Sequence, residues 1–366
     1  MESNLTRRLN AISGNDAARI YGKIAKIDEF KGWFKAAPGL GPQILGSLKQ
    51  STIVSSVGSS TRIEGSKMSD DQVKKLLSGL KVSRLKDRDS QEVAGYAELL
   101  ETIFDNYNQI QITENIILGF HDALLKFSEK DKRHKGRYKF LSNAVVARDN
   151  KGNESVIFNP TEPYLAQKET RELIDWVIKA YADGIFHPLL IAANFNLEFL
   201  SIHPFQDGNG RLSRAVLNLM LLKSGYSYAR YASLEKIIED NKASYYLALR
   251  KSQKNRGKKA ENVTPWLDFI LDVLVKQAET VKETVQGENP LFLISEKHRA
   301  ILELFEKHET ITNKIIVSRL KMNRETAGQS LARLVKLKLI KKTGSGRATA
   351  YVSMGNEEKD FNNQYY

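Results

Sequence analysis

The chain has 366 residues, enough for two or three domains, and no cysteine, which excludes disulfides and thiolate metal sites. Its 56 Lys and Arg against 43 Asp and Glu give a net charge of +13. No apolar run is long enough to span a membrane and the N-terminus lacks a signal-peptide core, so we expect a cytoplasmic protein without membrane contact. Only 8 prolines and many helix-favouring residues predict a mainly α-helical chain.

The N-terminal third, residues 1–110, is predicted to be helical. A Ser- and Thr-rich segment from Leu48 to Ile63 leads to Gly65, a natural helix stop. Glu64 in the last helical turn opposes the helix dipole, so either another group holds it or it is a solvated residue at a frayed end. Residues 68–90 are rich in charge and are expected to form an exposed helix and loop.

Apolar residues recur at helical spacing from Ala94 to Tyr107 and from Ile112 to Phe127, which predicts two further helices in the core. After them, β-prone residues flank the polar, glycine-containing segment Asp149–Asn153. This pattern predicts a β-hairpin, which could be a surface hairpin without a role or part of a site.

The stretch from His203 to Arg214 carries most of the titratable chemistry. Apolar helical spacing over Leu189–Ile202 and again over Leu212–Leu222 predicts a tight loop between two core helices. Gly208 and Gly210 can take backbone angles closed to other residues, so successive N–H groups can form a nest for an anion. The following helix N-terminus adds further N–H donors.

Charged side chains in this stretch fit a phosphate. Arg211 and Arg214 are three residues apart and share a helical face, so both can bind a phosphate bidentately. Asp207 is an oxygen ligand suited to Mg²⁺ beside a phosphate. His203 can accept a proton at neutral pH. The stretch therefore predicts phosphate chemistry with a general base.

The twelve residues resemble the signature of the Fic family, His-x-Phe-x-Asp/Glu-Gly-Asn-Gly-Arg-x-x-Arg, at every specified position. The resemblance implies a helical bundle that transfers AMP from ATP, with Mg²⁺, to a protein hydroxyl and releases pyrophosphate. It implies these roles: His203 as the base, Asp207 as the Mg²⁺ ligand, Gly208, Asn209, Gly210 and Arg211 around the phosphates, Arg214 on the γ-phosphate and Phe205 as a core anchor.

Ser60-x-x-x-Glu64-Gly65 resembles the Fic inhibitory motif, in the class that carries it before the catalytic motif. There the glutamate would pair with Arg214 and displace the γ-phosphate. A carboxylate and a phosphate compete for one guanidinium, so the physics supports such inhibition.

The resemblance also implies that the hairpin is a flap pairing with an extended segment of the target. Phe158-Asn159-Pro160 departs from the family's commoner aromatic-or-valine-Pro-Pro pattern. A predicted helix from Asn241 to Gln253 would line the adenine pocket with Tyr246 and Gln253, although the family often has Asn at the latter position. Tyr246 and its neighbour Tyr245 could equally be packed in the core.

The C-terminal region is a separate basic module. Residues 291–355 hold 13 Lys and Arg against 5 Glu, a net charge of +8. Helices over Ser295–Lys307, from a Thr312 cap to Leu320 and from an Asn323 cap to Leu337 precede a short hairpin, which resembles a winged helix-turn-helix. Residues expected to face DNA phosphates are Arg324, Arg333, Lys336, Lys341, Lys342 and Arg347.

Together these patterns predict a helical region at 1–110 with the inhibitory motif, a catalytic domain at 111–285, a winged-helix-like domain at 290–355 and a disordered tail at 356–366. The leading function is an autoinhibited adenylyltransferase that modifies a Ser, Thr or Tyr hydroxyl of a target protein or of itself. Alternatives are a DNA-binding regulator with a nucleotide-sensing domain, transfer of another phosphate-containing group, and AMP removal with Glu64 positioning water. The basic domain could instead dock a protein or form a homodimer.

Overall fold

The computed structural model of the chain describes residues 3–36, 42–79, 85, 87–143, 145–148, 154–288, 295–306 and 308–354. They belong to two compact units: residues 1–37 with 41–281, and residues 282–366 with 38–40. Unit 1 therefore contains both regions that the sequence separated at residue 110. The expected hairpin turn at 149–153 and the tail at 356–366 lie outside the described residues.

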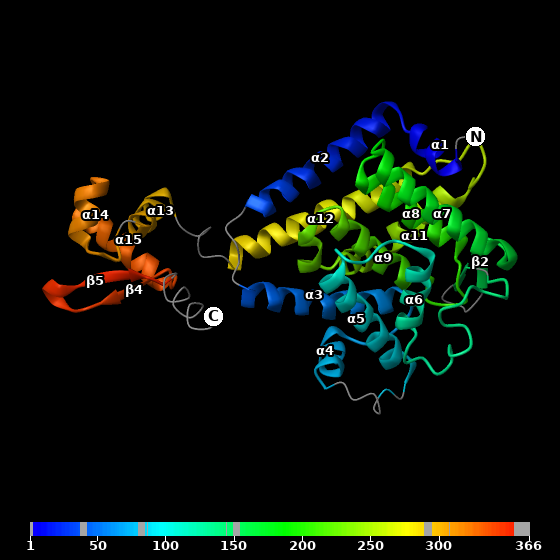
Figure 1. Ribbon diagram of the computed structural model, residues 1–366, viewed down its shortest axis with the longest axis horizontal. Helices are drawn as coiled ribbons and strands as arrows, with labels where there is room; N and C mark the ends of the chain where they lie inside the picture. The colour runs from blue at the N-terminus through cyan, green and yellow to red at the C-terminus, as the bar shows by residue number, and fades with distance from the viewer. Residues whose placement is uncertain are drawn as a thin grey trace. The chain divides into compact units, whose positions relative to one another are not determined.

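Unit 1 is a bundle of helices, as the sequence predicted (Figure 1). Its helices are α1 (Asn4–Asn10), α2 (Gly14–Ala36), α3 (Pro42–Ile63), α4 (Asp70–Ser78), α5 (Arg88–Asn106), α6 (Glu114–Leu124), α7 (Pro163–Asp183), α8 (Pro188–Ile202), α9 (Asn209–Lys223), α10 (Leu234–Asp240), α11 (Lys242–Gln253) and α12 (Thr264–Glu288), with a 3₁₀ helix at Ser227–Tyr231. Among these described helices, none combines the length and apolarity needed to cross a bilayer.

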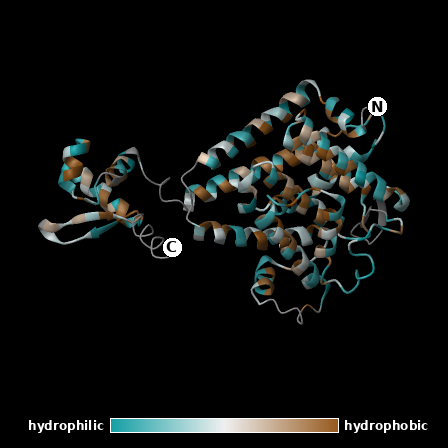
Figure 2. Cartoon of the chain, in the orientation of Figure 1, coloured by the Kyte–Doolittle hydropathy of each residue, from teal (hydrophilic) through white to brown (hydrophobic). Residues whose placement is uncertain are grey.

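The two central helices of unit 1 are α8 and α9, which pack against each other and against α5, α7 and α11. Every residue of α8 from Leu189 to Ile202 is buried, because other helices surround this largely apolar helix, and its few polar residues are hydrogen-bonded or ion-paired. Figure 2 shows the hydrophobic residues concentrated in the middle of the bundle. The two helices predicted around the His203–Arg214 stretch are confirmed, and the loop between them lies at the centre of the unit.

Helix α3 ends where the sequence predicted, since Gly65 has a φ of 110° that favours glycine. Its serines and threonines are small, and several are fully buried against α5 and α10. One expectation was wrong: residues 68–90 are not all exposed. Helix α5 begins within them, at Arg88, and Ser90 is buried because Asp87 caps the helix by accepting from the Ser90 N–H.

The predicted hairpin is confirmed as two antiparallel strands, β1 (Val145–Arg148) and β2 (Glu154–Phe158). Val146 pairs with Val156, and the register shifts by a bulge between Val145 and Val146. The hairpin joins the segment after α6 to the start of α7, and so lies between two elements that contact the central helices.

Unit 2 has three helices and a three-stranded antiparallel sheet with strand order β3-β5-β4. Its elements are α13 (Glu296–Glu303), a 3₁₀ turn (Leu304–Glu306), β3 (Thr310–Ile311), α14 (Asn313–Leu320), α15 (Arg324–Lys336), β4 (Ile340–Thr343), a 3₁₀ turn (Gly346–Ala348) and β5 (Ala350–Ser353). Thr312 and Asn323 cap α14 and α15 as predicted. Strand β3 was not predicted, because two residues are too few to show alternation.

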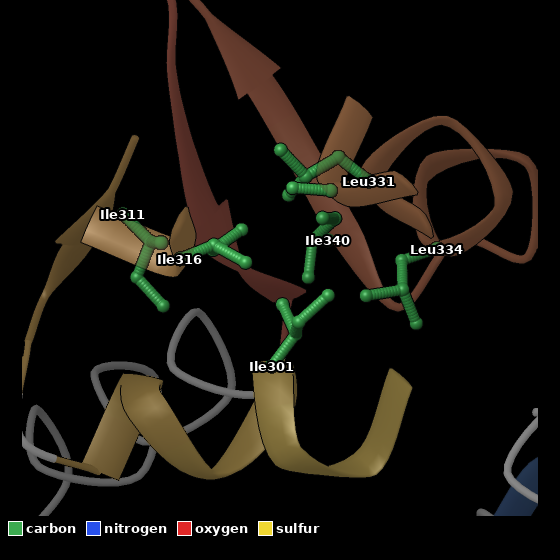
Figure 3. Packing of buried hydrophobic residues seen from close by; sticks show 7 residues of the cluster. Ile301, Ile311, Ile316, Leu331, Leu334 and Ile340 are labelled. Atoms are coloured by element: carbon green, nitrogen blue, oxygen red, sulfur yellow. The ribbon is translucent and has the colours of Figure 1, made fainter. Parts of the chain in front are cut away.

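The core of unit 2 is small and aliphatic. Its buried members are Ile301, Ile311, Ile316, Ala327, Leu331, Leu334 and Ile340. Figure 3 shows Ile301, Leu331 and Ile340 pointing toward one another from α13, α15 and β4. Each of the three helices and the sheet contributes one face to this core, so the described part of unit 2 has a core of its own.

Candidate functional site

His203 ends helix α8 in a left-handed backbone conformation, with a φ of 51°. Its Nδ1 lies 3.4 Å from the carbonyl oxygen of Leu200, which favours a proton on Nδ1 and leaves the Nε2 lone pair to accept another. Burial, and then the charge of Lys139, lower the pKa of His203 to about 4. The imidazole is therefore neutral at pH 7, as a general base must be.

Asp207, four residues later, has both carboxylate oxygens engaged. Oδ1 accepts from the Gly208 N–H at 2.5 Å and from Arg211 Nη2 at 3.2 Å, while Oδ2 accepts from Arg88 Nη2 at 2.8 Å. Burial raises the pKa of Asp207, but Arg211, Gly208 and Arg88 more than offset this and hold it below its ordinary value. Asp207 is therefore a carboxylate whose oxygens are both hydrogen-bonded to the chain.

Glu64 and the two arginines of the motif meet, although about 150 residues separate them. Glu64 Oε1 lies 2.9 Å from Arg214 Nη2, and Glu64 Oε2 lies 3.0 Å from Arg211 Nε. The two arginine side chains are 2% and 1% exposed, while that of Glu64 is 24% exposed. One carboxylate therefore bridges both guanidinium groups from the solvent side. The sequence predicted the contact to Arg214 and missed the one to Arg211.

The same carboxylate lies at the N-terminus of α9. A Cβ added at Gly210 would collide with Glu64 Oε1, so only glycine leaves room for the carboxylate there. The N-terminus of a helix stabilises an anion through its free N–H groups and its dipole. This explains how Glu64 is tolerated just after the last turn of α3, where the dipole is unfavourable.

Ser60, the other residue of the expected inhibitory motif, is fully buried and holds Arg214. Arg214 Nε donates to Ser60 Oγ at 2.9 Å, and Arg214 Nη2 donates to the Ser60 carbonyl at 3.1 Å. Helix α3 thus fixes the guanidinium group with Ser60 and faces it with Glu64, one helical turn apart.

Three further residues complete the site and were not predicted from the sequence. Arg88 Nε donates to Glu92 Oε1 at 2.6 Å, and Glu92 Oε2 forms an ion pair with Arg211 Nη1 at 3.0 Å. His121 of α6 is fully buried, and its ring stacks on Phe205 with centroids 3.8 Å apart. A polar residue at a core position of a largely apolar helix was the available signal for His121, whereas Glu92 lies on a helix with many other charged residues and gave no such signal.

His121 fixes the loop by its two ring nitrogens. Nδ1 accepts from the Gly136 N–H at 2.9 Å, so the proton must be on Nε2, which donates to the Asp207 carbonyl at 3.1 Å. Burial lowers the pKa of His121 to about 4, so the ring stays neutral. His121 is thus a structural histidine, with both ring nitrogens engaged by backbone groups.

The side chain of Asn209 hydrogen-bonds the backbone of the loop. Its Oδ1 accepts from the Phe205 N–H at 2.9 Å and its Nδ2 donates to the Phe205 carbonyl at 2.8 Å. Phe205 itself is fully buried, in the position of the expected core anchor. Of Asn209, only the backbone N–H at the start of α9 is therefore placed to hold an anion.

The two expected adenine contacts lie on α11, and Tyr246 is close enough to Arg214 and Glu64 for their charges to act on its pKa. The Tyr246 hydroxyl donates to the Ile63 carbonyl at 3.4 Å, next to Glu64, and its ring is half-buried. Gln253 is buried and donates to Ser201 Oγ at 3.2 Å, close to His203 in sequence. Tyr245, in contrast, is a core residue that packs on Trp266.

The basic run at residues 251–259, which we expected to be a solvated loop, begins within α11 and includes a basic residue that is tied to the fold. Arg256 pairs with Glu198 at 2.5 Å and with Glu169 at 2.7 Å. Its side chain is 21% exposed and ties the end of α11 to α7 and α8. The expectation was wrong for Arg256, because a charged residue in a sequence does not show whether acidic partners lie next to it in the fold.

Residues 111–221 match the model of the Fic/DOC family. Two curated proteins named protein adenylyltransferase Fic are similar to the chain. That of Aedes aegypti is 27% identical over 165 residues, 44% of this chain and 28% of the relative. That of Nematostella vectensis is 30% identical over 139 residues, 37% of this chain and 29% of the relative. The chain thus spans less than a third of the length of these relatives.

Two solved structures have a similar fold. A Fic family protein from Desulfovibrio desulfuricans superposes with a TM-score of 0.59 at 22% identity, covering 92% of this chain and 96% of its own. A Fic domain-containing signaling protein from Bacteroides thetaiotaomicron superposes with a TM-score of 0.59 at 22% identity, covering 74% and 98%. At this identity the similarity shows the helical fold.

Proposed function

We propose that this chain, which contains a Fic domain between residues 111 and 221, is an autoinhibited protein adenylyltransferase that uses ATP and modifies a hydroxyl side chain of a target protein or of itself. The similarity to proteins named adenylyltransferase supports the reaction class. The observation that carries the proposal is the site: a neutral histidine, a carboxylate and two converging arginines surround the N-terminus of one buried helix.

In the proposed reaction, His203 Nε2 takes the proton of the target hydroxyl as its oxygen attacks the α-phosphorus of ATP. The new oxygen–phosphorus bond replaces the bond to the leaving pyrophosphate. Arg211, Arg214 and the N–H groups at the start of α9 hold the β- and γ-phosphates and stabilise the charge that builds on the leaving group. Positioning and charge stabilisation carry most of such a phosphoryl-group reaction.

We propose Asp207 as the protein ligand for Mg²⁺. No group of three or more metal-ligating side chains occurs among the described residues, so the chain fits a cation held by one carboxylate, substrate phosphates and water. When bound, Mg²⁺ would neutralise charge on the phosphates. The side chain of Asp207 is 27% exposed, but Arg88 occupies Oδ2. Arg88 is 51% exposed and can move aside, which makes Oδ2 available to the cation.

We also propose that the Glu64 contacts inhibit the enzyme. The carboxylate pairs with both arginines and lies against Gly210, where the γ-phosphate would need to bind. ATP could then bind only with its terminal phosphate displaced, which moves the α-phosphorus out of line with the attacking oxygen.

The reaction can be tested by the position of the label that is transferred. A Glu64→Gly protein incubated with lysate proteins and α-labelled ATP should give labelled protein, whereas γ-labelled ATP should give none, because AMP keeps only the α-phosphate. Transfer of the γ-label would show phosphate transfer, and no labelling in either arm would overturn the proposed activity. A pure nucleotide sensor is less well supported, because it would need no neutral base at His203.

For unit 2 we propose binding to double-stranded DNA. From residue 313 to residue 353 the sequence holds ten Lys and Arg and one acidic residue, Glu325. The exposed residues of α15 are Arg324, Glu325, Gln329, Ala332, Arg333 and Lys336, so the helix presents three of the expected phosphate contacts to solvent. In this basic module the capped helix α15 follows α14 after three residues, as in a helix-turn-helix. The second helix of such a pair is the one that enters the major groove.

Two of the expected phosphate contacts, Arg333 and Arg347, are less suited to a test because of where they lie. Arg333 lies on the side of α15 toward α13, since burial and then the charge of Arg333 lower the pKa of His298. The side chain of Arg347 lies outside the described residues. Lys336 and Lys342 are exposed on α15 and β4 and are the better pair for a test.

We expect the full chain to bind a duplex at low salt with an affinity that falls steeply as salt rises, by a slope of about 0.9 per phosphate contacted. Gel shift across a salt series measures this slope. The double variant Lys336→Ala, Lys342→Ala should reduce the steepness of the slope by the amount that about two phosphate contacts contribute. The matched variant Lys297→Ala with Arg299→Ala, on the exposed part of α13, should leave it unchanged. Absence of binding at low salt would favour protein docking or dimerisation instead.

A further inference from the structure

Lys139 is a buried lysine that the reaction described above does not use. Only 3% of it is exposed, and it lies in the segment between α6 and the hairpin. Burial lowers its pKa to about 8, so it is still mostly protonated at pH 7. A buried ammonium group needs hydrogen-bond acceptors, and the acceptors present here are backbone and amide oxygens around the base.

Its contacts enclose the turn at His203 on both sides. The Lys139 Nζ donates to the Ile202 carbonyl at 3.2 Å, and its backbone N–H donates to the Pro204 carbonyl at 2.9 Å. Asn143 adds two bonds: Oδ1 accepts from Lys139 Nζ at 2.9 Å, and Nδ2 donates to the Phe205 carbonyl at 3.0 Å. The carbonyl groups before and after His203 are therefore both held by this segment.

The turn needs such support because His203 adopts the left-handed region, which residues with a Cβ occupy uncommonly. Within α8, its N–H donates to the Phe199 carbonyl, and Nδ1 makes only the 3.4 Å contact to Leu200. The helix thus holds the backbone before the turn, and the Lys139 and Asn143 bonds hold it at the turn and after it.

The same segment leads into the hairpin, since β1 starts two residues after Asn143. At the other end of the hairpin, the Thr161 N–H donates to the Ser201 carbonyl at 3.4 Å. Both ends of the hairpin are thus attached to residues 201–205. A target segment paired with this hairpin would have its distance to the base set by these bonds.

We propose that Lys139 and Asn143 are positioning residues: they hold the turn that presents His203 and attach it to the hairpin β1–β2. The inference rests on the proposed adenylyltransfer. The ring of His203 faces the charges of Lys139, Glu64 and Asp207, and Lys139 is the one whose charge lowers its pKa. Loss of Lys139 should therefore both displace the base and make it easier to protonate.

The test compares Lys139→Met, Asn143→Ala and Ser142→Ala, each in a Glu64→Gly background and each with a measured Tm. Ser142 is the matched control, because its hydroxyl donates to Glu162, at the start of α7 and outside the turn. For Lys139→Met we expect kcat to fall roughly a hundredfold, as for a base displaced by about 1 Å, with KM for ATP little changed. Asn143→Ala should also lower kcat, by a smaller factor. Ser142→Ala should change neither kcat nor KM for ATP.

Lys139→Arg should recover most of the loss, because a guanidinium group can still donate to the Ile202 carbonyl. In the pH profile of kcat/KM, the acidic limb should move upward in Lys139→Met, since that limb reports the base of the free enzyme. A Lys139→Met variant that keeps its Tm, its kcat and its acidic limb would overturn the proposal. So would a change confined to KM for ATP, which would make Lys139 a nucleotide contact.

An NMR titration of the His203 ring keeps this inference separate from the proposed reaction. The ring signal is assigned by its absence in His203→Ala, and no substrate is needed. In Lys139→Met its pKa should rise toward the ordinary value of about 6.5. If the parent Glu64→Gly protein transfers no AMP but this pKa rises, the proposed reaction fails and the positioning role stands. If AMP is transferred and the pKa stays the same in both Lys139→Met and Asn143→Ala, the positioning role fails alone.

Discussion

His203→Ala should abolish AMP transfer while ATP binding persists. In the proposed reaction the neutral imidazole takes the proton of the attacking hydroxyl, and loss of a general base costs about a hundred- to ten-thousandfold in rate. The residues expected to hold the phosphates, Arg211 and Arg214, are untouched by this change, so nucleotide affinity should stay within a small factor. Transfer of α-label in a Glu64→Gly background measures the rate, and calorimetric titration with ATP measures binding.

The control for this substitution is His308→Ala, which removes a histidine from unit 2 and should leave transfer unchanged. Because the pKa of His203 lies at about 4, the rate in the parent protein should stay level as pH falls from 7 to 6 and decline only near the pKa. Transfer by His203→Ala within tenfold of its parent would show that another group accepts the proton.

The sequence predicted several helices of both units well because their signals are local. Apolar spacing marked α8 and α9, side-chain caps marked α14 and α15, and Gly65 marked the end of α3. In each case the residues that decide the structure lie within one or two turns of the element. The twelve residues from His203 likewise form a short loop and the first turns of α9, and the Asn209 amide and Gly208 shape the loop locally.

Contacts between distant segments could not be predicted in the same way. Arg88 lies in the charged stretch 68–90 that was interpreted as exposed, and Glu92 follows that stretch; only the fold places them beside Asp207 and Arg211. Lys139 gave no local signal, because its partners are backbone carbonyls near residue 203. Glu64 was paired with Arg214 through a resemblance, and the second contact to Arg211 emerged from the structure.

Glu64→Gly should raise the rate of AMP transfer at least tenfold, which corresponds to about 1.4 kcal/mol of barrier, with a smaller change in ATP affinity. The substitution frees two arginines that remain held in place, Arg214 by Ser60 and Arg211 by Glu92 and Asp207. The guanidinium groups therefore keep the geometry that a γ-phosphate needs. Self-labelling with α-labelled ATP measures the rate, and Glu64→Gln, which keeps the size and loses the charge, should give an intermediate rate.

The same substitution should lower the Tm of the free protein and increase its stabilisation by ATP. Glu64 compensates two arginines that are almost fully buried, so its loss leaves positive charge without its partner. The triphosphate would then supply the missing negative charge, and a ligand that binds the folded state raises Tm. Destabilisation alone cannot mimic activation, because it lowers the amount of folded enzyme.

Arg214→Ala tests inhibition and binding together, because we propose that Arg214 takes part in both. It removes a contact of Glu64 and a contact of the γ-phosphate together, so it should not reproduce the activation seen in Glu64→Gly. The double variant should resemble Arg214→Ala, since relief of inhibition has no effect once the phosphate cannot be aligned. A Glu64→Gly protein that labels itself no faster than wild type would contradict the inhibitory role of Glu64. The ion pairs with Arg211 and Arg214 would then be contacts that stabilise the junction of α3 and α9 without controlling the reaction.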